Sequence, residues 1–223
     1  MFRTVCRVFR SLSQSLFRPL FASRAPGGFQ TTGRAAGNVS RAPRLHAMLG
    51  GTACVLALSA GLGACSPTFD WRTIMNNENG YTVDLPAKPG NDQRAVQIDG
   101  TPMQMAMQTA EAGDAVFAVG TVMLPNDSEA TQRAALDFLR MGLARNVGAA
   151  PDAHAVQIPL AAGGKVPGLE MKLSGEAGSQ REARTVYARL VARGRHVYQV
   201  AIIASKPMQQ EQVDQFFSSF QLY

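Results

Sequence analysis

The chain has 223 residues, with 22 basic and 16 acidic side chains, so its formal charge is +6. Eight arginines precede Cys65 and every acidic residue follows it, which leaves 14 basic and 16 acidic groups, a charge of −2, in the remainder. A near-neutral remainder without basic residues interleaved with aromatic ones excludes nucleic acid as the expected main partner.

The first 47 residues contain Arg, Ser and Phe but no acidic residue. A mitochondrial transit peptide has such a composition, but the motif at residues 62–65 argues against that organelle. We expect residues 1–47 to be an over-extended start or a basic n-region. Val39 and Met48 are the alternative initiators, and Val39 leaves Ser40 to Arg44 as a short basic segment.

An uncharged apolar run follows at residues 48–64, with Arg41 and Arg44 just before it. It is shorter than the ~20 residues that a membrane-spanning helix needs, and it predicts the h-region of a secretory signal. The run ends in Leu62, Gly63 and Ala64, followed by Cys65. This motif resembles the bacterial lipobox, which implies that a diacylglyceryl group is attached to the Cys65 sulfur and that the signal is cut just before it. The alternative is a buried cysteine after an apolar helix.

Residues 65–69 are then expected to be a lipidated Cys65 and a short tether. One acyl chain anchors a protein marginally and two anchor it stably. Ser66 resembles the residue found after the cysteine in lipoproteins sorted to the outer membrane. Cys6 and Cys54 both precede the predicted cut. No disulfide and no cysteine metal site is therefore expected in the mature chain.

Residues 70–223 are predicted to form a single globular domain, since their number suits one hydrophobic core. Apolar alternation predicts strands over 81–85 and 103–107, and residues 115–124 are apolar on both faces, as in a central covered strand. A helix is expected to begin at Asp127 or Ser128 and to end before Gly148, which suits a left-handed C′ position.

Strands are predicted again over residues 156–160 and 169–173, followed by a long hairpin of 181–193 and 196–205 whose turn contains Gly194. A last helix is expected to begin near Pro207. Its apolar face contains Val213, Phe216, Phe217 and Phe220. Residues 221–223 are expected to be a short strand or a docked tail. The predicted fold class is α+β, a largely antiparallel twisted sheet flanked by two or more helices, preceded by a cleaved signal segment.

Two short motifs carry a resemblance over about residues 70–223. Residues 80–86 read Gly-Tyr-Thr-Val-Asp-Leu-Pro, and the last predicted helix contains Phe216-x-x-Ser219-Phe220. They are similar to the opening strand and the closing helix of the Mog1/PsbP/DcrB-like domains. The resemblance implies a Mog1/PsbP-like α/β/α sandwich. It also implies an accessory or binding role without a particular ligand, because these domains share a scaffold and no reaction.

No catalytic constellation is found after Cys65. His154 and His196 are about forty residues apart, and no H-E-x-x-H, G-x-S-x-G or S-x-x-K pattern occurs. We expect His196 to be a solvated residue at a strand end, and Gly163-Gly164-Lys165 to be a hairpin or loop. No catalytic residue, no cofactor and no enzymatic activity is predicted.

Met103, Met105 and Met107 lie on one face of their predicted strand, because strand side chains alternate. Thioether sulfurs are soft ligands that select Cu(I), which makes these residues weak metal candidates. The favoured interpretation is a core position, because methionine fills irregular cores and Gln104 and Gln108 occupy the other face.

Arginine and tyrosine gather on the predicted long hairpin. Arg184, Tyr187, Arg189 and Tyr198 are candidates for a partner-binding patch, since both residue types anchor interfaces. The favoured alternative is a solvated sheet face whose arginines pair with local acids such as Glu182.

The sequence therefore predicts a lipoprotein of the cell envelope of a Gram-negative bacterium. It is expected to face the periplasm, with the outer membrane favoured over the inner, and to carry a non-catalytic accessory or binding domain. The expected partners are membrane lipid, through acylated Cys65, and an envelope protein. The first alternative is a periplasmic Cu(I) or small-ligand binding protein, and the second is an uncharacterised envelope enzyme.

Overall fold

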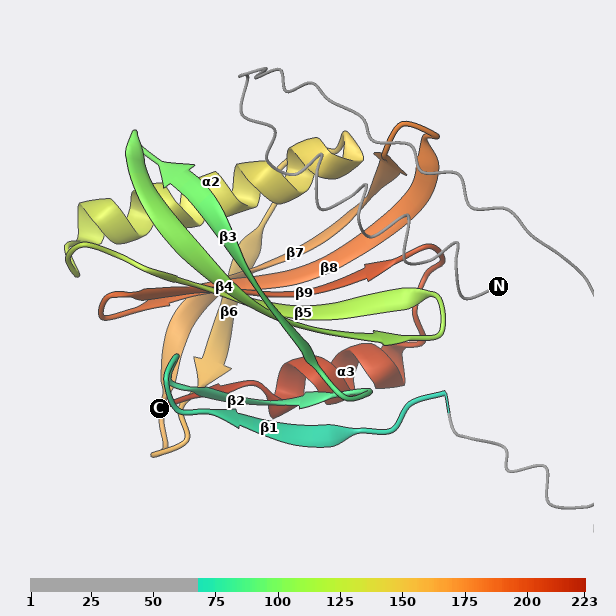
Figure 1. The fold of residues 1–223 in the computed structure, drawn as a ribbon, viewed down its shortest axis with the longest axis horizontal. Coiled ribbons are helices and arrows are strands. Elements are labelled where there is room, and N and C mark those ends of the chain that lie inside the picture. Colours follow the sequence, from blue (N-terminus) through green and yellow to red (C-terminus); the bar gives the residue numbers. More distant parts are fainter. Residues whose placement is uncertain (1–67) are drawn as a thin grey trace, which may run out of the picture. The chain divides into compact units, whose positions relative to one another are not determined.

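The computed structural model describes residues 68–223 (Figure 1). The predicted signal, its cleavage motif and Cys65 lie outside these residues. The described elements, in chain order, are β1 (Arg72–Asn76), β2 (Tyr81–Leu85), β3 (Gly90–Ile98), β4 (Thr101–Ala112), β5 (Ala115–Met123), α2 (Glu129–Val147), β6 (His154–Pro159), β7 (Lys165–Ala177), β8 (Glu182–Arg193), β9 (His196–Ala204), α3 (Gln210–Ser219) and β10 (Gln221–Leu222).

The strands form two antiparallel sheets. The larger has seven strands in the order β3-β4-β5-β9-β8-β7-β6, and the smaller has three in the order β1-β2-β10. Two series of hairpins, β3-β4-β5 and β6-β7-β8-β9, meet where β5 pairs with β9. The predicted α+β class with a largely antiparallel sheet and flanking helices is confirmed.

Helix α2 covers one face of the large sheet, and α3 lies with the small sheet on the other (Figure 1). Strand β5 contributes to both interfaces, because successive side chains point to opposite faces. Phe117 and Val119 are buried on the α3 side, and Val122 is buried on the α2 side. The prediction that this segment is a central strand covered on both faces is confirmed.

Helix α2 has the ends that the sequence predicts. The Ser128 Oγ accepts a hydrogen bond from the Thr131 backbone N–H at 3.3 Å, which satisfies one of the free donors of the first turn. At the other end Gly148 has φ 64°, the left-handed conformation that ends many helices. The buried face consists of Ala135, Leu139, Leu143, Ala144 and Val147.

Helix α3 begins at Gln210, three residues after the predicted start at Pro207. The Met208 backbone N–H donates to the Tyr187 hydroxyl at 3.2 Å, and this bond holds the preceding segment against β8. Phe220 has extended backbone angles and leads into β10, so its place on a continuous helical face was wrong, although its side chain is fully buried. Of the two alternatives for the last residues, the short strand is confirmed: β10 pairs with β2.

Candidate binding cleft

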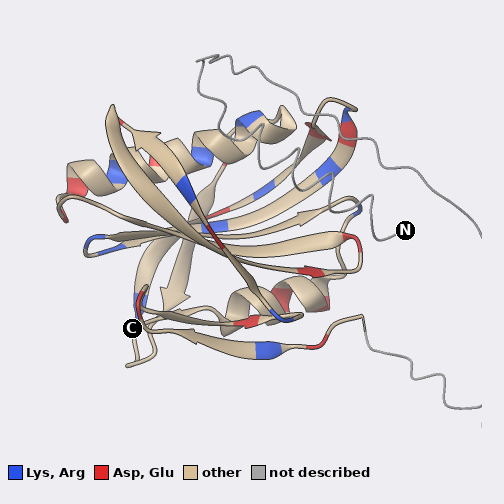
Figure 2. Ribbon diagram, viewed as in Figure 1, with Lys and Arg blue, Asp and Glu red and all other residues tan. Residues whose placement is uncertain are grey.

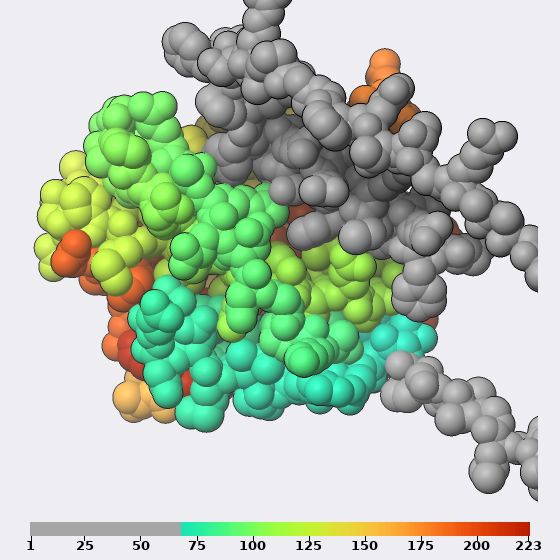
Figure 3. Space-filling model, viewed as in Figure 1, coloured from blue at the N-terminus to red at the C-terminus, as the bar shows by residue number. Residues whose placement is uncertain are grey.

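A cleft of about 640 Å³ lies between the turn that joins β1 to β2 and the strands β3 and β4. In Figure 3 the teal atoms of the β1–β2 segment lie beside the green atoms of β3 and β4. Its volume is in the range of small-molecule binding sites. Half of the twelve lining residues carry a side-chain amide group, namely Asn76, Asn77, Asn79, Asn91, Gln93 and Gln108.

Four cleft residues are joined in one hydrogen-bond chain. The Asn79 Nδ2 donates to Asn76 Oδ1 at 3.1 Å, and the Asn76 Nδ2 donates to the Tyr81 hydroxyl at 3.2 Å. The Tyr81 hydroxyl in turn donates to Gln108 Oε1 at 2.7 Å. At one end of this hydrogen-bond chain the Asn79 Oδ1 can still accept a hydrogen bond from a ligand. At the other end the Gln108 Nε2 can still donate hydrogen bonds to one. The wall is thus held in one orientation before any ligand arrives.

The turn is also tied to the large sheet. The Tyr198 hydroxyl of β9 donates to the Asn79 carbonyl oxygen at 2.8 Å, and the Tyr81 and Tyr198 rings meet edge to face at a centroid distance of 6.1 Å. Burial raises the pKa of Tyr81 and of Tyr198 to about 12. Both hydroxyls therefore remain protonated donors at physiological pH, which maintains the direction of the hydrogen-bond chain.

The lining carries negative and no positive charge. Glu78 and Asp92 contribute carboxylates, and among the lining residues there is no Lys, Arg or His. Arg94, on β3 outside the cleft, pairs with Asp92 through Nε at 3.3 Å. Phosphates and carboxylates would thus meet like charge without a cation to bind them, so the cleft suits a neutral ligand.

The two buried tyrosines predict a loss of stability at alkaline pH. An unfolded tyrosine ionises near pH 10, whereas burial holds both folded-state pKa values near 12. As the pH rises through this window the unfolded chain releases its protons first. The free energy of unfolding should therefore fall, by about 2 kcal/mol per tyrosine. Denaturant unfolding of the protein at about pH 9 and about pH 11.5 measures it.

Tyr81→Phe and Tyr198→Phe provide the control for this prediction. The quantity to compare is the change in unfolding free energy between the two pH values, because every titratable group other than the substituted tyrosine is present in all three proteins. Each variant is expected to show a smaller change than the unmodified protein. The same change in all three would show that neither hydroxyl is responsible.

The methionine row lies on the α2 side of β4. Met105 is 3% exposed and belongs to the core beneath α2, and Met103 and Met107 pack against the same core. A Cβ at Gly120 would lie 2.8 Å from Met107 Sδ and 3.6 Å from Met105 Sδ, so both sulfurs lie over this glycine. This packing supports a core role for the row, and Cu(I) binding stays an untested prediction.

The four residues of the candidate partner-binding patch do not form one exposed surface. Tyr187 and Tyr198 are 7% and 2% exposed and lie in the core on the α3 side. Arg184 pairs directly with Gly175, which faces α2, so it lies on the opposite face of the sheet from Tyr187. Arg184 forms an ion pair with Glu182, as the alternative interpretation predicted.

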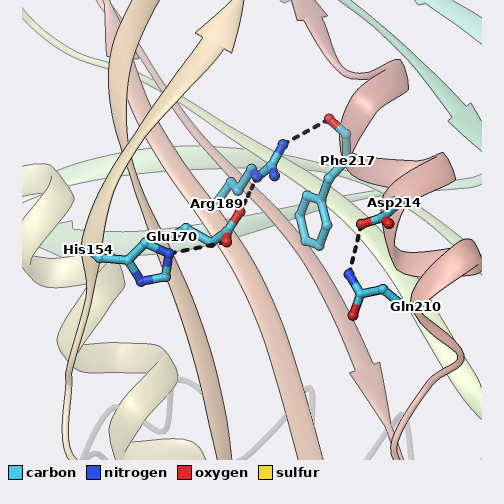
Figure 4. A network of polar contacts seen from close by, with 6 residues as sticks. All are labelled: His154, Glu170, Arg189, Gln210, Asp214 and Phe217. Atoms are coloured by element: carbon cyan, nitrogen blue, oxygen red, sulfur yellow. Dashed lines mark hydrogen bonds and ion pairs between the residues drawn. The ribbon is translucent and has the colours of Figure 1, made fainter.

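Arg189 belongs to a separate network on the α3 side (Figure 4). Its Nε donates to Glu170 Oε2 at 2.5 Å, and its Nη1 donates to the Phe217 carbonyl oxygen at 3.2 Å. His154 Nε2 lies 3.2 Å from Glu170 Oε1. The guanidinium also lies over the Phe217 ring, 4.8 Å from its centroid. These contacts join α3 to β7 and β8, so Arg189 supports the fold.

His196 lies at a strand end, as expected, since it is the first residue of β9, but it is half-buried and not fully solvated. Its ring lies against Tyr198 at a centroid distance of 5.9 Å, and its Nε2 is buried without a hydrogen-bond partner in the described part of the chain. Burial, followed by the charge of Arg195, lowers the pKa of His196.

Gly163 and Gly164, with φ 91° and 85°, form the predicted hairpin turn between β6 and β7.

The cleft was not identified from the sequence. Its residues come from the β1–β2 turn, the start of β3 and the middle of β4, and each group alone is an ordinary polar segment. The available signal was the composition of the turn, Asn76-Asn77-Glu78-Asn79-Gly80. It contains more polar side chains than a tight turn requires.

Within residues 68–223 no group of three or more His, Cys, Asp or Glu side chains is arranged to hold a metal ion. Over the same residues, no helix has the length and apolar character needed to cross a membrane. Lys and Arg positions are spread along α2 and several strands and are mixed with acidic ones (Figure 2).

The chain matches no family model, no curated protein and no solved structure.

Proposed function

We propose that the chain is a lipoprotein of the Gram-negative cell envelope, anchored by acylated Cys65 and carrying a non-catalytic binding or accessory domain that faces the periplasm. The observation that carries the proposal is the motif Leu62-Gly63-Ala64-Cys65 at the end of an uncharged apolar run. The separation of charge supports it: all acidic residues follow the motif. Ser66 favours the outer membrane over the inner.

The start of the described fold is consistent with a short tether. The Asp70 backbone N–H donates to the Pro86 carbonyl oxygen at 2.8 Å. The rings of Phe69 and Trp71 stack at 5.8 Å and both meet Phe117 edge to face. Packing therefore begins four residues after Cys65. The four residue steps from Cys65 to Phe69 reach at most about 14 Å, which would hold the domain close to the headgroups.

The cleft lies at the far end of β1 from this tether. Arg72 pairs with Leu85 at the tether end of the β1–β2 ladder, and Asn76 pairs with Tyr81 at the cleft end. Five strand residues separate the two ends by about 14 Å. In an anchored protein the cleft would thus be directed away from the attachment point, where a ligand of the envelope has access to it.

The proposed fold family is the Mog1/PsbP-like sandwich. Its two supporting motifs lie in contact, although they are far apart in the sequence. The Asp84 backbone N–H of the opening strand donates to Ser219 Oγ of the closing helix at 2.8 Å. Gln215 Nε2 donates to Asp84 Oδ2 at 2.9 Å, and the Tyr81 and Phe220 rings lie 5.8 Å apart. An accessory or binding role is what this resemblance implies.

The anchor is tested by mass spectrometry of the full-length protein expressed in a Gram-negative host and extracted from its membranes. We expect a chain that begins at Cys65 and carries a thioether-linked diacylglycerol. Cys65→Ala should yield no acylated chain, because the acceptor sulfur is gone. Cys54→Ala is the matched control, since it removes a thiol of the same precursor and should be processed normally. An unmodified protein that retains residues before Cys65, or that carries no lipid, would contradict the proposal.

A further inference from the structure

We propose that the cleft between the β1–β2 turn and strands β3 and β4 binds a neutral saccharide. This inference depends on the proposed function only in treating the domain as a binding module. It does not require the lipid anchor. The chemistry of the lining, its charge, its preformed hydrogen bonds and its apolar border each support this ligand class.

Side-chain amides are suited to sugars because each presents a donor and an acceptor in one plane. Neighbouring hydroxyl groups of a sugar, or the amide of an acetamido group, offer the matching acceptor and donor. The hydrogen-bond chain from Asn79 to Gln108 ends in a free acceptor on one side and free donors on the other. A ligand that both donates and accepts can therefore engage both ends.

The border of the cleft adds further amides that the fold does not use. Among the described residues, the side chains of Asn77, Asn91 and Gln93 form no hydrogen bond, and all three are exposed. Their hydrogen-bonding capacity is thus available to a ligand. Met75, which also lines the cleft, is 68% exposed and offers an apolar surface for the C–H face of a sugar or for an acetamido methyl group.

The charge of the lining selects a neutral sugar over an acidic one. The carboxylates of Glu78 and Asp92 can accept hydrogen bonds from hydroxyl groups. Glu78, which has no ion pair among the described residues, repels uronic acids and phosphorylated sugars. A cationic ligand such as a polyamine is less well matched. The lining has six amides for two carboxylates, and Arg94 already neutralises one of these.

A peptide is the competing ligand, because β3 is an edge strand of the large sheet. Peptides that add to a sheet edge bind through main-chain hydrogen bonds and place alternate side chains in pockets. The hydrogen-bonding groups of this cleft are instead mostly on side chains, so we favour the saccharide.

The test is isothermal titration calorimetry with the full-length protein in a detergent that contains no sugar. The neutral probes are chitotetraose, which carries acetamido groups, and cellotetraose, which carries hydroxyl groups alone. Tetragalacturonate, spermidine and tetraalanine test acidic, cationic and peptide ligands. We expect at least one neutral saccharide to bind with a Kd on the order of a millimolar or tighter, and the other three probes to bind more weakly.

Gln108→Glu is the central variant. It keeps an oxygen to accept the Tyr81 hydroxyl, removes the Nε2 donors and adds a charge, and we expect it to weaken saccharide binding about tenfold or more. Gln104→Glu is the matched control, because Gln104 is an exposed residue of the same strand outside the cleft. It should leave the Kd unchanged. The double variant Asn77→Ala, Gln93→Ala should also lose about tenfold in affinity at an unchanged melting temperature.

Three results would overturn the proposal: no binding of either neutral saccharide, tighter binding of another probe, or equal effects of Gln108→Glu and Gln104→Glu. Each of these can occur whether or not Cys65 is acylated. Failure of the ligand assignment is therefore distinguishable from failure of the proposed anchor, which the mass of the extracted chain reports separately.

Discussion

Gly175→Ala is expected to lower the free energy of unfolding by about 3 kcal/mol. A Cβ at this position of β7 would lie 1.8 Å from the Val147 carbonyl oxygen and 2.9 Å from its carbonyl carbon. These are backbone atoms of the last turn of α2, so no side-chain rotation relieves the overlap. The helix end must lift from the sheet, and Leu143 and Val147, which are buried there, must lose packing.

Gly142→Ala is the matched control for Gly175→Ala. Gly142 lies within α2, and apart from its chain neighbours and the backbone of the helix itself, a Cβ there would meet no described atom within 4 Å. Alanine is the better helix former, so this variant should raise the free energy of unfolding by about 0.5–1 kcal/mol. Urea unfolding followed by circular dichroism compares the two. The same small effect from both substitutions would mean that α2 does not pack on β7 as closely as described.

Phe216→Ala is expected to have an effect of about 3–5 kcal/mol on the free energy of unfolding. Phe216 is fully buried where α3 faces the large sheet. Its ring meets Phe117 edge to face at 5.2 Å and lies 5.2 Å from Phe217. The substitution removes both ring contacts and leaves a cavity between α3 and the sheet, which the surrounding structure can fill only in part.

Denaturant unfolding monitored by the fluorescence of Trp71 measures this effect. Trp71 is the only tryptophan in the chain, and its ring lies 5.8 Å from that of Phe117, which touches Phe216. Ser218→Ala, on the exposed side of α3, is the control and should change the free energy of unfolding by less than about 0.5 kcal/mol. A small effect of Phe216→Ala would contradict the packing of α3 on the sheet.

The elements that the sequence predicts well are those with strong local patterns. Tyr81, Val83 and Leu85 alternate with polar residues, and the structure buries all three in β2. The hairpin turn at Gly194, with φ 55°, and the ends of α2 follow from preferences of single residues. Such features depend on residues within a few positions of one another, so they can be predicted from the sequence alone.

The elements that were not predicted lack such patterns. In β3 the first four residues are all exposed, and the strand forms because its backbone pairs with β4. In β1 no residue is fully buried, and its partner β2 supplies the ladder. Each strand pairs through its backbone with the next strand along the chain, and backbone pairing leaves no periodic trace in an exposed segment. This is why both strands were missed.

The candidate sites divide in the same way. Strand alternation alone places Arg184 and Tyr187, three residues apart, on opposite faces, so the sequence argued against a single patch. The burial of Tyr187 and Tyr198 was not predictable, because it depends on α3 and the small sheet covering that face. The binding cleft depends on a further non-local contact, since the Tyr81 hydroxyl at the start of β2 donates to Gln108 of β4.

By itself the sequence determined the strand faces, the ends of α2, the hairpin turn and the motif at Cys65 that predicts an anchor, because each arises from residues adjacent in the chain. The tertiary structure alone decided which sheet faces are covered and which amides meet in a cleft. The reason is physical: the hydrogen bonds from Tyr81 to Gln108 and from Tyr198 to Asn79 require segments up to 119 residues apart to pack together. No local preference encodes that meeting.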